Sequence, residues 1–270
     1  MLELARKINL SENLISKLEL FLEEKAKEVE RLAVRCETDS FSCLKGKGKM
    51  MNLAVILFLA VRVKEKYSEK GISDEIYYDT MGDIKIWCEK NGDEGLEKYG
   101  WLKNHVSFEL FRIGRLQFQF YRCNNKTLKY KKLPFSYGEK LIYVHIPEGE
   151  KLEKERCIDS LRMADVFFAD FFPEYSYSHY FCESWLLFER NRDFMSPCSN
   201  ILSFMSLFDI RYSMNIDAQT IERVFGKRRI IVNRYPEKTE LQRRLKSYIK
   251  SGHRPGIGVG VISRERVQNF

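Results

Sequence analysis

The 270-residue sequence lacks the patterns that would define a disulfide framework, a metal site or a membrane span. Its seven cysteines are scattered and none lies in a CxxC pair, so we expect reduced, mostly buried thiols in a cytoplasmic protein. The four histidines are isolated in sequence, which excludes the usual spacing of metal ligands. The apolar run at residues 50–61 is short of the ~20 residues that a bilayer crossing needs, and we expect no membrane partner.

Acidic residues are scarce near the C-terminus. Between residues 223 and 266, thirteen Lys or Arg accompany three Glu, whereas the whole chain has a formal charge of +8, which leaves the rest near neutral. A basic segment of this kind favours an anionic partner, such as a phosphorylated cofactor, a nucleic acid or an acidic protein. A solvated face without a ligand explains the same pattern equally well.

The chain is rich enough in hydrophobic residues, at 44%, to bury a substantial core. Residues 1–100 are predicted to be helical, because apolar side chains recur at three-to-four spacing in "ENLISKLELFLEEKAKEVERLAVRC" and Ser73 is a plausible N-cap for "DEIYYDTMGDIKIW". Near Trp101 the period changes to two, so we place a domain boundary there and a second domain over residues 101–270.

The second domain alternates strands and helices. We predict strands at "SFELFRIGRLQFQFYR", "EKLIYVHI", "FCESWLL" and "GIGVGVI", and a turn with an exposed basic edge at "NNKTLKYKK". Helices are predicted at "KLEKERCIDSLRMADVFFADFF", "SPCSNILSFMSLF" and "TELQRRLKSYIKS". The fold class is therefore α/β or α+β, with helices on the faces of a sheet. The glycines of "GIGVGV" indicate close packing of a late strand, because no helix or Lys-Ser/Thr follows them as in a phosphate loop.

His145 is the first candidate for chemistry. It ends a predicted strand, where α/β sheets tend to place ligands, and a neutral imidazole there could accept a proton. A ring satisfied by the backbone is the alternative. Glu183 is a second candidate, since a carboxylate between Cys182 and Ser184 in an apolar strand needs a partner. Cys182 is better explained as a small buried hydrophobe than as a nucleophile paired with His145.

Three polar residues, Arg112, Arg115 and Gln117, interrupt the most apolar strand. A buried arginine must be paired, either with an internal carboxylate such as Glu183 or with an anionic substrate. In "PEGEKLEKE", Gly149 could let a phosphate approach a helix start. The glutamates around it complement the helix dipole without any ligand, so the phosphate signal is weak.

Taken together, "GISDEIYYDTMGDIKIW", "FELFRIGRLQFQF", "VHIPEGEKL", "FCESWLL" and "SNILSFMSLF" resemble a group of bacterial acyltransferase-domain proteins. These have a helical N-terminal domain and a domain similar to the GCN5-related N-acetyltransferases (GNAT). The resemblance implies a mixed, mostly antiparallel sheet and an acyl-CoA-dependent N-acyltransferase that uses acetyl-CoA or another acyl-CoA. Its partners would be a small-molecule acyl donor and an acceptor, with nucleic acid as an unlikely one.

The resemblance also assigns roles. His145 or Glu183 would deprotonate an amine nucleophile, and Ile146, Gly149 and Asn200 would contact the cofactor between the splayed strands. Substrate binding would fall to the acceptor side, with the candidates Arg112, Arg115, Gln117 and Trp185.

Two features depart from the family pattern. The Q/R-x-x-G-x-G/A phosphate signature is missing, and Phe208 stands near where many GNAT enzymes hold a tyrosine acid. A non-catalytic GNAT-like protein that binds a ligand or regulates is therefore the alternative, and nucleic-acid binding through the basic segment is a weaker one.

Overall fold

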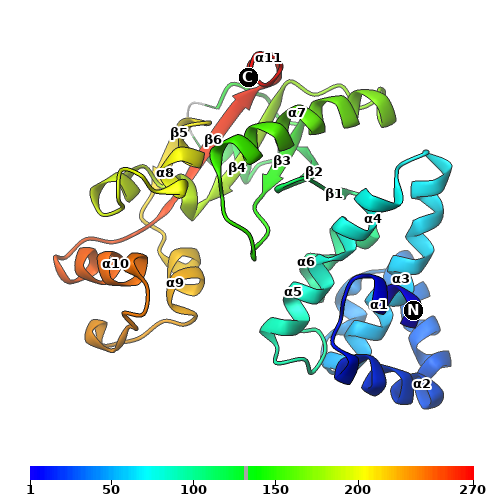
Figure 1. The fold of residues 1–270 in the computed structure, drawn as a ribbon. Coiled ribbons are helices and arrows are strands. Elements are labelled where there is room, and N and C mark those ends of the chain that lie inside the picture. Colours follow the sequence, from blue (N-terminus) through cyan, green and yellow to red (C-terminus); the bar gives the residue numbers. More distant parts are fainter. Residues whose placement is uncertain (131–132) are drawn as a thin grey trace. The chain divides into compact units, whose positions relative to one another are not determined.

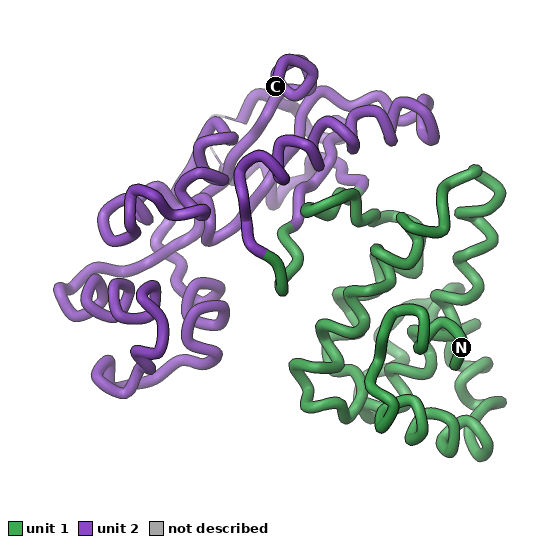
Figure 2. Tube along the Cα trace, in the orientation of Figure 1, with its two compact units in different colours: residues 1–119, 146–150 green, residues 120–145, 151–270 purple. Residues whose placement is uncertain are grey.

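The structure, a computed structural model, describes residues 1–130 and 133–270. The chain forms two compact units, coloured separately in Figure 2. The N-terminal unit holds residues 1–119 and 146–150, and the C-terminal unit holds residues 120–145 and 151–270. Figure 1 shows that the expected helices and the expected sheet are both present.

The N-terminal unit is helical up to residue 106, as predicted. Its helices are α1 (Leu2–Lys7), α2 (Glu12–Thr38), α3 (Lys49–Glu69), α4 (Asp74–Met81), α5 (Asp83–Lys90) and α6 (Tyr99–Val106). Ser73 caps α4 as expected, because its hydroxyl accepts a hydrogen bond from the main-chain N–H of Ile76 at 3.4 Å. The helical pattern that begins there is broken at Gly82, between α4 and α5. Helix α3 is largely buried from Met51 to Ala60 and packs against α1, α2, α4 and α6.

The alternating stretch at residues 107–122 is a hairpin, so the prediction of one long strand was wrong. Strand β1 (Leu110–Ile113) pairs antiparallel with β2 (Leu116–Arg122). The two-residue connection begins at Gly114, whose φ is 62°; a type II′ turn needs a glycine at this position. Both halves alternate with period two, so the pattern alone did not reveal the turn.

The described strands form one sheet in the order β1-β2-β3-β4-β6-β5. Its later members are β3 (Lys140–His145), β4 (His179–Ser184), β5 (Asp209–Met214) and β6 (Ile257–Ser263). Strands β3 and β4 are parallel, whereas β6 pairs antiparallel with β4 on one side and β5 on the other. The sheet is therefore mixed and mostly antiparallel, as expected.

Two predicted elements needed correction. Residues 124–130, predicted as a turn with an exposed basic edge, contain the 3₁₀ turn η2 (Thr127–Lys129) and no strand, and Lys131 and Lys132 lie outside the described residues. Strand β4 ends at Ser184, because the Ser184 hydroxyl accepts from the N–H of Leu186 and starts the 3₁₀ turn η3 (Trp185–Leu187). A further turn, η4 (Glu189–Asp193), follows it.

The helices of the C-terminal unit are α7 (Lys154–Phe171), α8 (Asn200–Met205), α9 (Ala218–Phe225), α10 (Glu240–Lys250) and α11 (Arg264–Gln268). Helix α7 lies along the sheet in Figure 1. The basic helix α10 begins with a capping box formed by Thr239 and Gln242. Helices α9 and α10 are inserted between β5 and β6 and share a small core built around Phe225, Leu245 and Tyr248.

A buried carboxylate fastens the last helix to α7. Asp165 accepts hydrogen bonds from Arg264 Nε at 2.6 Å, Gln268 Nε2 at 2.9 Å and the Tyr177 hydroxyl at 2.8 Å. Burial alone would raise the pKa of Asp165, but these three donors outweigh it and hold that pKa below its usual range.

The glycines in and just before β6 are required for close packing, as predicted, but the expectation that no helix follows them was wrong, because α11 begins directly after β6. A Cβ at Gly258 would lie 1.8 Å from the carbonyl oxygen of Leu187 in η3, and one at Gly256 would lie 2.1 Å from the carbonyl oxygen of Met214. Because neither distance is sterically possible, any side chain at these positions must displace main chain. The close contact between β6 and η3 therefore determines the position of the main chain directly after β4.

Candidate active site

The pairing of the parallel strands β3 and β4 ends before their carboxyl ends. Their register joins Ile142 to Tyr180 and Tyr143 to Phe181 and, among the described residues, extends no further. Strand β3 nevertheless runs on to His145, and β4 stays paired with β6 as far as Ser184 opposite Gly258. The facing edges beyond Tyr143 and Phe181 therefore present main-chain groups that an extended ligand could pair with.

His145 lies at this opening, at the end of β3. Its imidazole is half-buried and stacks on the ring of Tyr143, with 4.3 Å between the ring centroids and 16° between the planes. The Tyr143 hydroxyl donates to the carbonyl oxygen of Glu183 at 3.3 Å. Burial raises the pKa of Tyr143 well above its usual range, so this hydroxyl keeps its proton. Tyr143 thus holds the histidine ring and links β3 to β4.

Glu183 lies on β4 and is half-buried, and its carboxylate has an internal partner. The Tyr130 hydroxyl donates to Oε2 of Glu183 at 2.7 Å. Burial, together with the neighbouring carboxylate, raises the pKa of Tyr130, which therefore remains a donor across the physiological range. The Tyr130 ring lies 5.6 Å from that of Tyr212 on β5, centroid to centroid. Tyr130 was not among the predicted site residues, because its segment was interpreted as an exposed basic edge.

Cys182 is fully buried, and burial raises the pKa of its thiol, so it is not set up as a thiolate. Strand alternation places it on the opposite face of β4 from Glu183. This agrees with the interpretation of Cys182 as a small buried hydrophobe.

In the N-terminal unit, two of the predicted substrate-binding arginines hold the segment 146–150. The Arg112 guanidinium forms an ion pair with the carboxylate of Glu150. Arg115 is only 3% exposed and donates to the carbonyl oxygens of Pro147 at 3.0 Å and of Glu150 at 2.8 Å. The internal partner of Arg112 is thus Glu150 and not Glu183, which was the carboxylate considered from the sequence.

The segment held by these arginines contains two predicted cofactor-binding residues. Ile146 is half-buried, and Gly149 is exposed with a φ of 100°, a conformation that favours glycine. The Glu148 carboxylate pairs with Lys90 Nζ at 2.6 Å. Both glutamates that flank Gly149 are therefore neutralised by cations of the N-terminal unit.

Gln117 belongs to a buried polar cluster of the N-terminal unit. It is 1% exposed, and its Nε2 lies 3.4 Å from Nε2 of His105. His105 Nε2 in turn lies 3.2 Å from Asp83, which also accepts from the Trp101 indole at 2.7 Å. Burial would raise the pKa of Asp83, but His105, Trp101 and Gln117 together keep it lowered.

Trp185 and Asn200, the remaining predicted residues, lie beyond β4. The Trp185 main-chain N–H donates to Oε1 of Gln219 at 2.7 Å, and its half-buried indole packs against the α9–α10 core. Asn200 is exposed at the start of α8, where Ser199 is the N-cap. The roles assigned to these residues stay predictions.

Helix α7 begins at Lys154, four residues later than the "PEGE" turn. Its N-cap is Glu153, whose carbonyl accepts from Cys157 and whose side chain makes no capping hydrogen bond. The helix start therefore carries its partial positive charge without a capping side chain at the N-cap position. Such a terminus can hold an anion.

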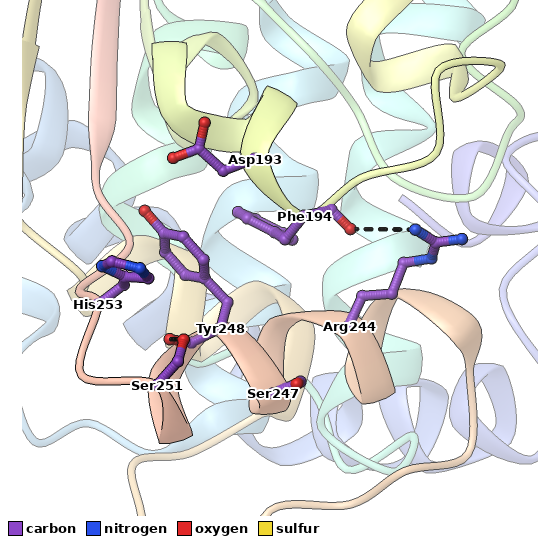
Figure 3. A pocket seen from close by; sticks show the side chains of 7 residues that line it. All are labelled: Asp193, Phe194, Arg244, Ser247, Tyr248, Ser251 and His253. Carbon is purple, nitrogen blue, oxygen red and sulfur yellow. Dashed lines mark hydrogen bonds between the residues drawn. The ribbon is translucent and has the colours of Figure 1, made fainter.

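A shallow pocket of about 330 Å³ lies elsewhere in the C-terminal unit, beside α10 (Figure 3). It is lined by Asp193, Phe194, Arg244, Ser247, Tyr248, Ser251 and His253. Among the described residues the Tyr248 hydroxyl has no hydrogen-bond partner, although the residue is only 6% exposed. None of the predicted site residues lines this pocket, so it is separate from the opening between β3 and β4.

The order β1, β2, β3, α7, β4, α8, β5, β6, with its opened parallel pair, is the arrangement of a GNAT-like domain. In agreement, residues 110–262 match the family described as the GNAT-like C-terminal domain, and residues 1–108 match the N-acyltransferase N-terminal domain. The chain therefore belongs to the GNAT-like C-terminal domain family and carries an N-acyltransferase N-terminal domain ahead of it. This confirms the resemblance found from the sequence.

Solved structures with the same fold include acyltransferases. One, in complex with decanoyl-CoA and teicoplanin, has a TM-score of 0.76 and 21% identity, covering 97% of this chain and 86% of that one. Another, in complex with decanoyl-CoA, has a TM-score of 0.78 and 18% identity, with 96% and 86% covered. A mutant acyltransferase in complex with octanoyl-CoA has a TM-score of 0.75 and 21% identity, with 97% and 86% covered. No curated protein gave a significant match.

No helix in residues 1–130 or 133–270 is long and apolar enough to span a membrane. Across the same described ranges, no three or more His, Cys, Asp or Glu side chains cluster as metal ligands would.

Proposed function

We propose that the protein is an acyl-CoA-dependent N-acyltransferase whose donor lies between β3 and β4. The observation that carries this proposal is the register that stops at Tyr143 and Phe181 while both strands continue. The pantetheine arm of CoA is an extended chain with two amides, so it can pair with strand edges in the way another strand would. His145 and Glu183 lie on the two strands that border this opening.

The pyrophosphate of CoA would bind at the start of α7. Its main-chain N–H groups and partial positive charge suit an anion, and Lys151, Lys154 and Arg156 lie around the same turn in sequence, together with Glu153 and Glu155. The two glutamates that precede this turn in sequence, Glu148 and Glu150, are ion-paired within the N-terminal unit, and paired carboxylates repel an anion less than free ones. Gly149, Ile146 and Asn200 remain the predicted contacts of the donor.

In the reaction, the amine nitrogen of the acceptor attacks the thioester carbonyl carbon. The C–N bond forms as His145 or Glu183 accepts the amine proton, directly or through a water molecule. Main-chain N–H groups at the strand edges stabilise the oxyanion. The C–S bond then breaks, and CoA leaves as a thiolate that takes up a proton. Tyr130 positions the Glu183 carboxylate by hydrogen bonding throughout.

The donor is proposed to carry a medium-length acyl chain as well as, or instead of, an acetyl group. The supporting comparison is that acyltransferases of this fold were solved with octanoyl-CoA and decanoyl-CoA. Arg112, Arg115, Gln117 and Trp185 stay the predicted residues on the acceptor side, and the acceptor would be a polar or anionic amine.

Isothermal titration with acetyl-, octanoyl- and decanoyl-CoA tests donor binding, and release of free CoA thiol in the presence of amines tests transfer. We expect binding of at least one donor, and loss of transfer with retained binding in His145→Ala or Glu183→Gln. Failure of all three acyl-CoAs to bind would refute the proposal.

A non-catalytic GNAT-like protein is the second candidate. Phe208, near the position where many GNAT enzymes hold a tyrosine acid, is 5% exposed and packs against Phe204, so it fills a core position and has no proton to give. Acyl-CoA binding without thiol release by any amine would favour this candidate over the enzyme. Nucleic-acid binding remains the weaker alternative, and a DNA gel shift that weakens steeply with salt would support it.

A further inference from the structure

The segment between α9 and α10 carries an exposed aliphatic tip. Ile230 is 102% exposed and Ile231 is 48% exposed, and both belong to the sequence "GKRRIIVNRYP" at residues 226–236. An isoleucine at such exposure leaves a large apolar area in contact with water. Single exposed apolar residues are common on protein surfaces, whereas two adjacent ones indicate a contact surface.

The tip is exposed because the residues on either side of it are held to α9 and α10 by packing and hydrogen bonds. The Tyr235 ring stacks on Phe225 with 4.2 Å between centroids, and its hydroxyl accepts from the main-chain N–H of Arg229 at 3.2 Å. Lys246 Nζ donates to the carbonyl oxygens of Asn233 and Tyr235, both at 2.8 Å. The two ends of the segment are thus held to α9 and α10, and Ile230 and Ile231 lie at the turn between them.

Positive charge surrounds the tip. Residues 226–236 contain Lys227, Arg228, Arg229 and Arg234, and no carboxylate. Arg228 forms an ion pair with the largely buried Asp217 at the start of α9. Lys227, Arg229 and Arg234 are exposed. The segment therefore combines two exposed isoleucines with exposed cationic side chains that lie beside them in sequence.

Although no membrane partner was expected from the sequence, we infer that this tip docks on an anionic lipid surface, with Ile230 and Ile231 entering the interface and the neighbouring cations contacting lipid headgroups. Basic residues beside exposed aliphatic side chains match the two attractions that such a surface offers. A nucleic acid would be attracted by the cations but would gain nothing from the exposed isoleucines. Its bases stack on aromatic rings, and residues 226–234 contain no aromatic residue. The inference is independent of acyl transfer.

Co-sedimentation with lipid vesicles tests it on the full-length protein without any acyl-CoA. We expect binding to vesicles of phosphatidylcholine mixed with phosphatidylglycerol, and little binding to phosphatidylcholine alone. Replacing both isoleucines, in Ile230→Ser with Ile231→Ser, should weaken binding at least about ten-fold, given the apolar area withdrawn. Replacing Arg229 with Gln should weaken it about five-fold, and added salt should do the same progressively.

A matched control uses two exposed apolar residues of α7, Met163 and Val166, at 53% and 60% exposure. The double variant Met163→Ser with Val166→Ser should bind vesicles as the wild type does. Circular dichroism should show that both double variants are folded. The inference is overturned by any of three results: no binding to anionic vesicles, equal loss in the α7 control, or isoleucine variants that bind as well as wild type.

Discussion

The hydrogen bond between Tyr130 and Glu183 allows a quantitative test of how the candidate base is held. The hydroxyl lies 2.7 Å from the carboxylate and both residues are half-buried. Hydrogen bonds to charged groups contribute about 1.5–3 kcal/mol to stability, and partial exposure places this one at the lower end, about 1.5 kcal/mol. Tyr130→Phe should lower the free energy of unfolding by that amount.

A double-mutant cycle separates this hydrogen bond from the packing of the ring. In a Glu183→Met background the phenol has lost its carboxylate partner, so Tyr130→Phe should cost close to nothing. The matched control is Tyr137→Phe, since Tyr137 lies in the same segment and is 68% exposed; it should change stability by less than about 0.5 kcal/mol. Urea denaturation followed by tryptophan fluorescence gives all these values.

The same variants test the proposed mechanism. Because Tyr130 contacts Glu183, one of the two proposed bases, Tyr130→Phe should reduce thiol release about ten-fold, equivalent to about 1.4 kcal/mol, while the dissociation constant for acyl-CoA stays unchanged. An equal cost of Tyr130→Phe in both backgrounds would refute the coupling. A weaker acyl-CoA affinity with unchanged turnover would place Tyr130 on the donor instead.

Three further substitutions test interactions that hold each unit together internally. Asp165→Asn should lower the free energy of unfolding by about 2 kcal/mol at neutral pH. Because the pKa of Asp165 is lowered in the folded state, its contribution to stability is present above the unfolded-state pKa and is lost as pH falls through the folded-state pKa. The free energy of unfolding should therefore fall less steeply with decreasing pH in this variant than in the exposed-site control Asp170→Asn. Gly258→Ala should destabilise by more than about 3 kcal/mol because no Cβ fits against η3, whereas Gly100→Ala, with open space around it, should be nearly neutral in thermal melts. Arg115→Lys should cost about 2 kcal/mol, since an ammonium cannot reproduce two guanidinium bonds to separate carbonyls; unchanged stability with lost transfer would instead support the predicted role in acceptor binding.

Local patterns predicted much of this fold because they depend on neighbours in the chain. The N-cap at Ser73, the buried character of α3 and the close packing of the β6 glycines all follow from side-chain chemistry within a few residues. The position of His145 at a strand end was predictable for the same reason. Errors occurred where two structures share one pattern: the hairpin at Gly114 preserves the alternation of a single strand, so period two could not distinguish them.

The partners of the candidate site residues were not predictable, because they come from distant segments. Glu183 was expected to need a partner, and the structure supplies Tyr130, 53 residues earlier in the chain. Arg112 was considered as a partner of Glu183, but its carboxylate is Glu150. A sequence shows that a buried charge must be satisfied, whereas the choice among carboxylates and hydroxyls depends on the three-dimensional arrangement.

In the segment after β3, residues 146–150, such long-range partners change the functional interpretation. In the sequence, Glu148, Glu150 and Glu153 count against a phosphate site, because each adds negative charge near Gly149. In the structure, Lys90 and Arg112 neutralise Glu148 and Glu150, whereas Glu153 is the N-cap of the helix that begins at Lys154 and makes no side-chain capping hydrogen bond. The charge at this helix start is therefore set by the helix terminus and by the basic and acidic residues of its first turn. Glu150→Gln should accordingly leave CoA affinity nearly unchanged, whereas Lys154→Glu should weaken it, and titration calorimetry with CoA would show a reversed order if the glutamates governed binding.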